Sequence, residues 1–353
     1  MAEIEPPIKK AKMPQDMDNF IQKVMNSKTN LTAVMDDIYT KSLPLTKCYV
    51  GNVIDMKQLS RIILLLNERL PLTMLQHLKR VYKRSVLICT VSHFNDTTHD
   101  SIQEYLDSNI PELKNVFDYI KEVDLPASAP LTKKQSLECR FRWSCNFHPI
   151  QRIETLMSDS CFNKNDLRLH RVYMGMALEI VKIKNDFDTL QDLRTLNVNA
   201  AVVVDPTTRS VVTISLDNRI EHPTQHATMV AIDNVAKTQN GGAWHDNELE
   251  KDTILKIRQK FLNIPFGSRK FVSKKDETDD DKVDNSPYLC TGYDIYLVRE
   301  PCVMCAMGLV HARIKRVFYA FENTTLGALQ SRTKLHCVPY LNHRFEVFTG
   351  FDK

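Results

Sequence analysis

Three residues of this chain have the types and spacing of metal ligands. His226 opens the run HAT, and Cys302 and Cys305 lie in the run PCVMC. Histidine nitrogen and cysteine thiolate are ligands that Zn²⁺ prefers. Three protein ligands leave a fourth tetrahedral position open, as catalytic zinc sites do. The sequence therefore predicts a Zn²⁺ site whose fourth ligand is not identified.

The spacing of these residues indicates how the chain would bring them together. Cys302 and Cys305 are three positions apart, so on a helix they share nearly the same face. Pro301 suits the first turn of such a helix, and the positive end of the helix dipole favours thiolate over thiol. His226 also lies near the start of an expected helix. Two facing helix starts would supply all three ligands, and buried thiols without a metal are the alternative.

One position departs from the pattern that hydrolytic chemistry needs. The combination H-x-E with P-C-x-x-C is the signature of zinc deaminases, in which the glutamate transfers protons. Thr228 stands at the glutamate position, and its hydroxyl has no useful acidity near neutral pH. Asp233 lies five residues further along and points elsewhere on the helix. We therefore predict no catalytic residue in this chain and no deamination by the chain alone.

Longer runs around the three ligands resemble a known superfamily. HATMVAID, which begins at His226, and YDIYLVREPCVMCAMGLVHARI, which begins at Tyr293, resemble the cytidine/deoxycytidylate and TadA-like deaminases. Among these, they are most similar to the non-catalytic subunit of the eukaryotic tRNA wobble adenosine deaminase, a heterodimer. The resemblance covers about residues 165 to 353. The first half of the chain matches only in layout, as an appended tRNA-binding module.

The resemblance implies a function for the complex and a role for this chain. The complex would use Zn²⁺ to hydrolyse wobble adenosine to inosine, with a catalytic deaminase paralogue as partner and tRNA as substrate. This chain would be an inactive regulatory subunit that binds zinc, contributes tRNA binding and shapes the partner's pocket. A further hypothesis is that the C-terminal residues 350–353 fold over the fourth metal position.

The pattern of apolar residues divides the chain into two domains, an α/β domain preceded by an α+β domain. Residues 165–353 alternate strands and helices, which predicts a cytidine deaminase-like three-layer α/β/α domain. Residues 31–160 read as an α+β module, and the polar residues 1–30 as a disordered tail. A polar loop is inserted at 237–286, and its segment 274–282 is a charged low-complexity run.

Individual elements follow from periodicity and turn residues. In the second domain we expect a helix capped by Asp166, one that begins near His226 and one that Pro301 starts. The strands expected there are 199–204, 210–216, 293–298 and 316–320, and a short helix is expected at 254–261. In the first domain the expected helices are 56–70, 75–82 and pieces of 102–119, and the expected strands are 47–53, 85–91 and 138–147.

Positive charge gathers in the first half of the chain, although the net charge is only +4. Two basic clusters beside a deaminase-like domain favour a nucleic-acid surface over an ordinary solvated face. Recognition would depend on phosphate contacts and on the shape of the tRNA. The residues that we expect to bind tRNA are Lys79, Arg80, Lys83, Arg84, Lys133, Lys134, Arg140 and Arg142.

Bulk composition excludes several classes of protein. No apolar run is long enough to cross a bilayer, so we expect no membrane association. Residues 1–15 lack the apolar core of a signal peptide. Nine scattered cysteines do not fit a secreted disulfide framework, which favours a reducing compartment. We expect the chain in nucleus and cytoplasm, with Lys9, Lys10 and Lys12 as a candidate nuclear address.

Two other readings stay open at this point. The chain could be an active zinc deaminase with an unrecognised general base, which the missing glutamate argues against. It could also be an RNA-binding scaffold in which the deaminase fold is a relic. Binding of tRNA by residues 1–160 alone, with indifference to any partner, would favour the scaffold.

Overall fold

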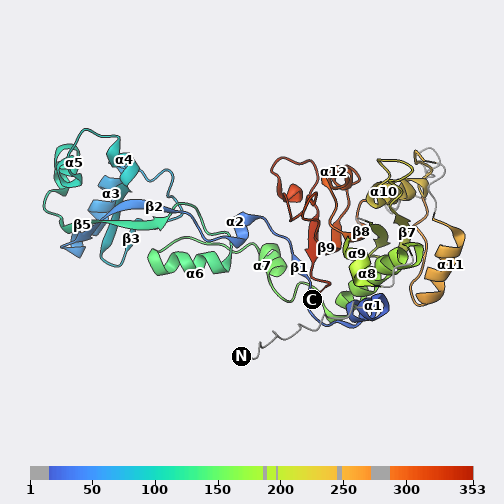
Figure 1. The fold of residues 1–353 in the computed structure, drawn as a ribbon. Helices are drawn as coiled ribbons and strands as arrows, with labels where there is room; N and C mark the ends of the chain where they lie inside the picture. The colour runs from blue at the N-terminus through green and yellow to red at the C-terminus, as the bar shows by residue number, and fades with distance from the viewer. Residues whose placement is uncertain (1–15, 186–188, 196–197, 245–248, 272–286, 353) are drawn as a thin grey trace, which may run out of the picture. The chain divides into compact units, whose positions relative to one another are not determined.

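The chain folds into two compact units (Figure 1). One unit combines residues 1–35 with 156–353, and the other comprises residues 36–155. The first stretch of the chain therefore belongs with the second half, and the intervening residues form a unit of their own. The computed structural model describes residues 16–185, 189–195, 198–244, 249–271 and 287–352.

A six-stranded sheet forms the centre of the larger unit. Its order is β1-β10-β9-β8-β6-β7, in which β8, β9 and β10 are parallel and the other neighbours are antiparallel. The hairpin of β6 and β7 and the strands β8 and β9 lie close to their predicted positions. The strands are β1 (Thr32–Ala33), β6 (Ala200–Asp205), β7 (Ser210–Leu216), β8 (Asp294–Arg299), β9 (Arg316–Phe321) and β10 (Glu346–Thr349).

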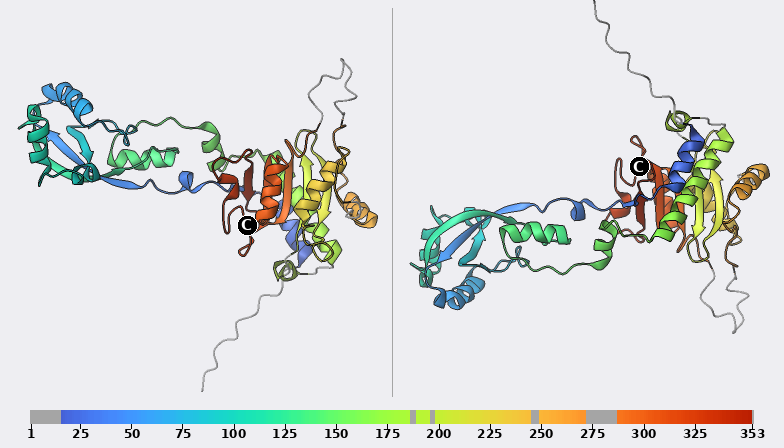
Figure 2. Two further views of the ribbon diagram at one scale, coloured as in Figure 1. Left: turned by 90° about the horizontal axis from the view of Figure 1, so that it is seen from above. Right: turned by 90° about the horizontal axis from the view of Figure 1, so that it is seen from below.

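Helices cover both faces of this sheet. On one face, Tyr296 and Phe318 pack into a core that includes α8 and α1, and on the other, Ile295 and Val317 pack with α10 and α12. The two views of Figure 2 show these layers. The predicted three-layer α/β/α architecture is thus confirmed. The helices of this unit are α1 (Met17–Asn26), α8 (Lys164–Asn185), α9 (Leu190–Thr195), α10 (Ala227–Lys237), α11 (Lys251–Lys260), α12 (Val303–His311) and the 3-10 helix η4 (Leu335–Cys337), and α7 (Gln151–Met157) contains the boundary between residues 155 and 156.

The helix α1 corrects the expectation of a disordered tail at residues 1–30. Its residues Phe20, Ile21 and Val24 are buried at helical spacing and join the core beside α8. The fully buried Arg171 of α8 donates to the carbonyl oxygens of Val24 and Thr29, which holds this segment in place. The tail prediction is therefore wrong from residue 16 onward. The rest of the tail, with the candidate nuclear address, lies outside the described residues.

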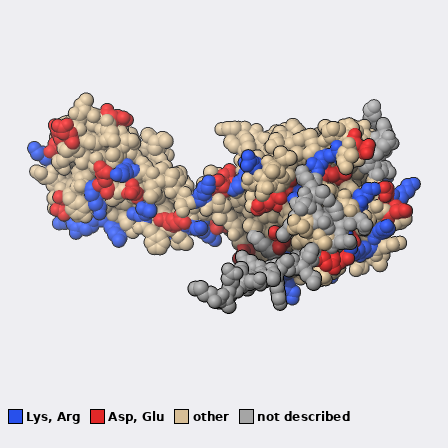
Figure 3. Space-filling view, in the orientation of Figure 1, with Lys and Arg blue, Asp and Glu red and all other residues tan. Residues whose placement is uncertain are grey.

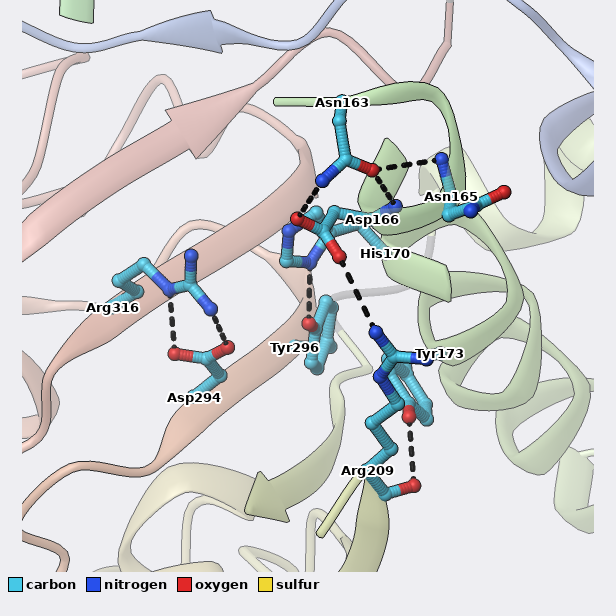
Figure 4. A network of polar contacts seen from close by, with 9 residues as sticks. All are labelled: Asn163, Asn165, Asp166, His170, Tyr173, Arg209, Asp294, Tyr296 and Arg316. Carbon is cyan, nitrogen blue, oxygen red and sulfur yellow. Dashed lines mark hydrogen bonds and ion pairs between the residues drawn. The ribbon is translucent and has the colours of Figure 1, made fainter. Parts of the chain in front are cut away.

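A polar network marks the edge of the sheet where β8 and β9 begin (Figure 4). Asp294 and Arg316, the first residues of these two strands, form a buried ion pair with Nε and Oδ1 2.7 Å apart. Nearby, His170 Nδ1 lies 2.7 Å from the Tyr296 hydroxyl. Burial, with Arg316 close by, lowers the pKa of His170 to about 3, so its imidazole is neutral at physiological pH.

The start of α8 differs from the expectation that Asp166 caps it. Asn163 precedes the helix, and its side-chain oxygen accepts from the amides of Asn165 (3.0 Å) and Asp166 (2.9 Å). The Asp166 carboxylate accepts from the Asn163 side chain in return, as Figure 4 shows. The arrangement is a reciprocal cap that begins three residues earlier than predicted.

The smaller unit, residues 36–155, is an antiparallel sheet of order β3-β4-β2-β5 packed with helices. This is an α+β arrangement, as the sequence predicted for this half. Its strands are β2 (Leu45–Val53), β3 (Val81–Tyr82), β4 (Ser85–Thr90) and β5 (Phe117–Pro126). Its helices are α2 (Asp37–Thr40), α3 (Leu59–Arg69), α4 (Val91–Asn95), α5 (Ile102–Asn109) and α6 (Lys133–Arg142), with 3-10 turns η1 (Met56–Gln58) and η2 (Pro111–Leu113).

Two elements of this unit were predicted wrongly, and the strand β5 begins at Phe117, within the stretch 102–119 that was expected to be helical in pieces. Residues 138–147 alternate apolar and polar side chains, which predicted a strand, but α6 runs to Arg142. Thr132 caps this helix by accepting from the Gln135 amide, and the alternation is misleading because Phe141 points to solvent. The helix expected at 75–82 is also absent: two turns lead into β3 there, which pairs with β4.

The insertion at 237–286 is only partly a polar loop. Its helix α11 buries Ile257 and Phe261 in the core beside α8, and Lys260 pairs with the buried Glu179 at 2.8 Å. The charged run 274–282 lies outside the described residues. Among the described residues, no helix is both long and apolar enough to cross a membrane.

Candidate metal centre

The structure brings His226, Cys302 and Cys305 together where two helices begin. His226 is the residue directly before α10, Cys302 is the residue directly before α12, and Cys305 lies in the first turn of α12. One potential ligand atom from each residue lies within 4.8 Å of the others, and Cys302 Sγ is 3.7 Å from His226 Nδ1. Pro301 lies outside α12 and not in its first turn, and its carbonyl accepts from Ala328 at 2.9 Å.

The electrostatics of the site favour a cysteine thiolate. A hydrogen bond from Cys305 lowers the pKa of Cys302 to about 5, and the helix amides of Cys305 and Met304, with His226 nearby, act in the same direction. A sulfur that is ionised at neutral pH beside an imidazole and a second thiol is a donor set that suits Zn²⁺. The residues present therefore fit the metal that the sequence predicted.

A buried carboxylate supports the histidine. Asp217, directly after β7, accepts from the amides of Ala227 (2.8 Å) and Asn199 (2.7 Å) and from the Arg219 guanidinium (2.8 Å). Ala227 is the first residue of α10, so Asp217 supplies the cap that the His226 side chain does not. Burial raises the pKa of Asp217, and these donors act against that rise.

A second buried carboxylate supports the cysteines. Glu300, directly after β8, accepts from the amides of Asn323 (3.1 Å), Leu329 (2.8 Å) and Ser331 (2.9 Å). The amide of Gln330 and the Ser331 hydroxyl also donate to it. Five donors from one loop thus converge on the residue two positions before Cys302. They fix the strand end from which α12 starts.

Thr228 occupies the position where the signature has glutamate. It is the second residue of α10, 1% exposed, and its hydroxyl is hydrogen-bonded with Cys305. Asp233 lies away from the ligands: it accepts from the Ala243 amide and pairs with Lys237 at 3.3 Å. The structure therefore brings a hydroxyl, and not this carboxylate, to the metal centre.

The cavity over the three ligands is small. It has a volume of about 20 Å³, and its lining includes Asn199, Asp217, Thr228 and Leu326. That volume holds about one water-sized group, whereas pockets for drug-sized ligands run from roughly 300 to 1,000 Å³. Of the C-terminal segment, the described residues 350–352 do not line it. The hypothesis of a closing tail is wrong for Phe351, which is buried against Phe318 in the core, and Lys353 lies outside the described residues.

The residues predicted to bind tRNA fall into two groups. Arg80 and Arg84 support the fold: Arg80 donates to the carbonyls of Leu66 (3.0 Å), Leu70 (2.9 Å) and Ile88 (3.2 Å). Arg84 donates to the carbonyls of Val53 (3.3 Å), the last residue of β2, and of Ile54 (2.9 Å). Burial lowers the pKa of Arg80 to about 10. Arg84 is nevertheless exposed, as are the six others, which are Lys79, Lys83, Lys133, Lys134, Arg140 and Arg142.

Asp217, Glu300 and Asn199 were not identified from the sequence. The Asn199 side-chain amide pairs with the backbone of Arg299, accepting at 3.0 Å and donating at 3.0 Å, and so joins β6 to the end of β8. Asp217 and Glu300 lie directly after β7 and β8, and Asn199 lies directly before β6. A polar side chain at the end of a buried strand, next to the ligands, is the signal that could have found them.

Comparison with known proteins identifies the family. The zinc-binding region of cytidine and deoxycytidylate deaminases matches residues 170–321. The "probable inactive tRNA-specific adenosine deaminase-like protein 3" of Danio rerio is 32% identical over 352 residues, which covers 96% of this chain and 95% of that protein. The chain belongs to the family of tRNA-specific adenosine deaminase-like protein 3.

Relatives from other organisms match over different shares of the chain. The protein of the same name from Homo sapiens is 31% identical over 327 residues, which are 90% of this chain and 88% of that protein. The "tRNA-specific adenosine deaminase subunit tad3" of Schizosaccharomyces pombe is 31% identical over 65% of this chain and 59% of its own length. The resemblance inferred from the residues around His226 and Cys302 is confirmed.

Proposed function

We propose that this chain is the non-catalytic, zinc-bearing subunit of a tRNA adenosine deaminase that converts wobble adenosine to inosine. The observation that carries the proposal is the buried Thr228 hydroxyl beside an intact set of ligands, His226, Cys302 and Cys305. Homologues named as a probable inactive protein and as a deaminase subunit support it.

The carboxylates around the site do not replace the missing glutamate. Asp217 and Glu300 both line the cavity, and each accepts hydrogen bonds on both of its oxygens from main-chain amides. Protonating either would weaken the loops that hold the ligands. The Asp233 carboxylate already accepts from the Ala243 amide and pairs with Lys237. These commitments argue against an unrecognised general base among the described residues.

The size of the cavity argues in the same direction. A volume of about 20 Å³ leaves no room for an adenine ring over the three ligands. Zn²⁺ held by His226, Cys302 and Cys305 would cross-link the starts of α10 and α12, and binding energy of that kind stabilises the fold. The fourth ligand stays unidentified.

The surface around the metal centre suits a catalytic partner. Exposed apolar side chains lie on or beside the residues that line the cavity: Ile220, Val303, Met304 and Leu326. Ile220 is 98% exposed although it is large and aliphatic. Contiguous exposed apolar surface marks interaction sites. We assign it to the catalytic paralogue, whose own site would then lie beside this silent one.

The smaller unit is proposed to bind the tRNA. Lys and Arg side chains gather along the lower edge of this unit in Figure 3. Its exposed lysines and arginines would contact phosphates, so tRNA affinity should fall as salt rises. The expected presence in nucleus and cytoplasm stays a prediction.

Reconstitution tests the proposed function. The chain would be expressed with and without the catalytic paralogue and incubated with a tRNA transcript that carries adenosine at the wobble position. We expect a stable complex, inosine only when both chains are present, and zinc in this chain. A complex that forms but gains no activity or tRNA affinity from this chain would contradict the proposal.

The alternative of a hidden active site has its own test. Thr228→Glu restores the signature glutamate in the chain alone. We expect no inosine, because the cavity is too small for adenine whatever residue stands at position 228. Inosine from the Thr228→Glu chain, measured by digestion and mass spectrometry, would show that only the missing carboxylate silences the site.

A further inference from the structure

The helix α6 presents an unusual outer face. Phe141 is 88% exposed, and among the described residues it is the one exposed phenylalanine. Leu137, one helical turn earlier, is 58% exposed. Because residues at i and i+4 are neighbours on a helix, these two side chains form one apolar strip. Four exposed cations flank the strip, and they are Lys133, Lys134, Arg140 and Arg142.

The opposite face of α6 prevents the helix from rolling to bury this strip. The buried Gln135 side chain donates to the carbonyls of Ile38 (2.8 Å) and Lys41 (2.9 Å) and accepts from the Leu131 amide (2.9 Å). Cys139 packs into the core of the smaller unit. The fold thus holds the Phe141 ring outward on a rigid helix.

The end of α6 is joined to the other basic cluster. The Trp143 indole donates to the Lys79 carbonyl at 2.6 Å, and the Lys79 amide donates to the Ser144 carbonyl at 2.9 Å. The Trp143 ring also lies 5.5 Å from that of Tyr82, over which the Lys83 ammonium sits at 5.3 Å. Two clusters about fifty residues apart in sequence therefore meet at one end of the helix.

The charges of this face are not neutralised by the described part of the chain. Among the described residues, no ion pair engages the side chains of the four flanking cations. The nearest acids are engaged or half-buried: Glu154 accepts from the Lys133 amide at 2.7 Å, and Glu138 is partly covered on α6. A single exposed apolar residue needs no explanation, but an aromatic ring framed by unpaired cations is the pattern of proteins that stack single-stranded bases.

We propose that the outer face of α6 binds an unpaired stretch of tRNA, with Phe141 stacked on a base and the flanking cations on the adjacent phosphates. This rests on the proposed function, because tRNA is the RNA that such a subunit would meet. A base ring offers two π faces whatever its identity, so stacking tolerates many loop sequences. Paired A-form RNA keeps its bases inside the helix, so the ring selects an unpaired segment.

The experiment uses the complete complex with its catalytic paralogue and measures tRNA affinity by fluorescence anisotropy. Phe141→Ala should weaken binding by roughly 5- to 150-fold, the range for loss of one stacked base. Phe141→Trp should retain the affinity, and Phe141→Leu should weaken it nearly as much as alanine does. Because position 141 is exposed, all three variants should fold like the parent.

Salt dependence and a paired probe separate stacking from charge. Phe141→Ala should leave the slope of log affinity against log salt unchanged, whereas Lys134→Ala should lower its magnitude by roughly 0.7 to 0.9. The effect of Phe141→Ala should vanish on a fully paired RNA duplex of equal length. Equal losses on duplex and tRNA would overturn the stacking proposal.

The remaining outcomes are also decisive. If the parent complex makes inosine and Phe141→Ala binds tRNA equally well, the inference about α6 fails and the proposed function stands. If the Phe141→Ala chain instead no longer co-elutes with the catalytic paralogue in size-exclusion chromatography, the strip is a protein contact and the inference is overturned. If the parent complex neither binds tRNA nor makes inosine, the proposed function fails and the inference fails with it.

Discussion

The metal centre and the outer face of α6 use charged groups in opposite ways. At the metal centre, the Asp217 and Glu300 carboxylates accept hydrogen bonds from main-chain amides on both of their oxygens. On α6 the cations are exposed and bind nothing in the described chain. Carboxylates whose hydrogen bonds are all made within the chain stabilise the fold, whereas exposed cations without an ion-pair partner are available to bind another molecule. Substitutions should therefore change stability at the first region and RNA affinity at the second.

Loss of a metal ligand should have the largest effect. Cys302→Ser removes the sulfur whose pKa is lowered, and zinc affinity should fall by more than about 100-fold, since loss of even an outer partner costs roughly 10- to 100-fold. Zinc per chain would be measured by mass spectrometry after dialysis. Cys161→Ser, at a half-buried cysteine outside the site, is the control. An unchanged zinc content in the Cys302→Ser variant would show that Cys302 is not a zinc ligand.

Loss of the Glu300 charge should destabilise the metal-bearing unit without touching a ligand. Glu300→Gln puts an amide group where five donors converge, which should lower the free energy of unfolding by about 3 kcal/mol. Glu322→Gln alters an exposed carboxylate in the neighbouring segment and should change it by less than about 0.5 kcal/mol. Urea unfolding measures both, and equal effects would contradict a supporting role for Glu300.

Substitutions of two adjacent cations in the smaller unit should have different effects, one on stability and the other on tRNA affinity. Arg80→Met leaves three carbonyls without their guanidinium and should cost about 2 to 3 kcal/mol of stability. Lys79→Ala should leave stability within about 0.5 kcal/mol and weaken tRNA binding. Thermal unfolding and anisotropy on both variants check this pair. If the two variants behave alike, the division between structural and RNA-facing cations is wrong.

The buried His170 should give the metal-bearing unit a dependence on pH. Its pKa is about 3 when folded and about 6.5 when unfolded, so below pH 6.5 the unfolded chain binds the extra proton. Stability is therefore complete above pH 6.5 and falls as the pH drops, by about 2 kcal/mol between pH 7 and pH 5. His170→Gln should show a flatter profile in denaturant unfolding. Parallel profiles for both proteins would mean that His170 does not titrate in this way.

The sequence predicted the metal centre better than it predicted the RNA surface, and the reason is physical. Cys302 and Cys305 are tied by helix geometry, so a short motif predicts their arrangement. Asp217 and Glu300 act through main-chain amides that no motif encodes. In the smaller unit, alternation around Phe141 suggested a strand, because burial on one face cannot be read from residue type alone. Arg80 and Lys79 look alike in sequence, and only the fold separates them.

The sheet of the larger unit was also largely predictable, because β6, β7, β8 and β9 are buried aliphatic runs bounded by turn residues. The helix α1 was missed because its polar neighbours and prolines suggested disorder. Its burial depends on α8, which lies more than a hundred residues further along the chain. The helical spacing of Phe20, Ile21 and Val24 was the local signal for a helix, whereas its packing partner is set by the tertiary fold and leaves no such signal.

The measurement that tests the central claim most directly is made on the isolated, zinc-loaded chain. Zinc content and inosine formation would be determined on the same sample, with a large excess of protein over a wobble-adenosine tRNA. We predict about one zinc per chain, in keeping with the one set of three ligands found among the described residues, and no inosine until the catalytic paralogue is added. Inosine formed by this chain alone would contradict the account and require a proton-transferring group other than Thr228.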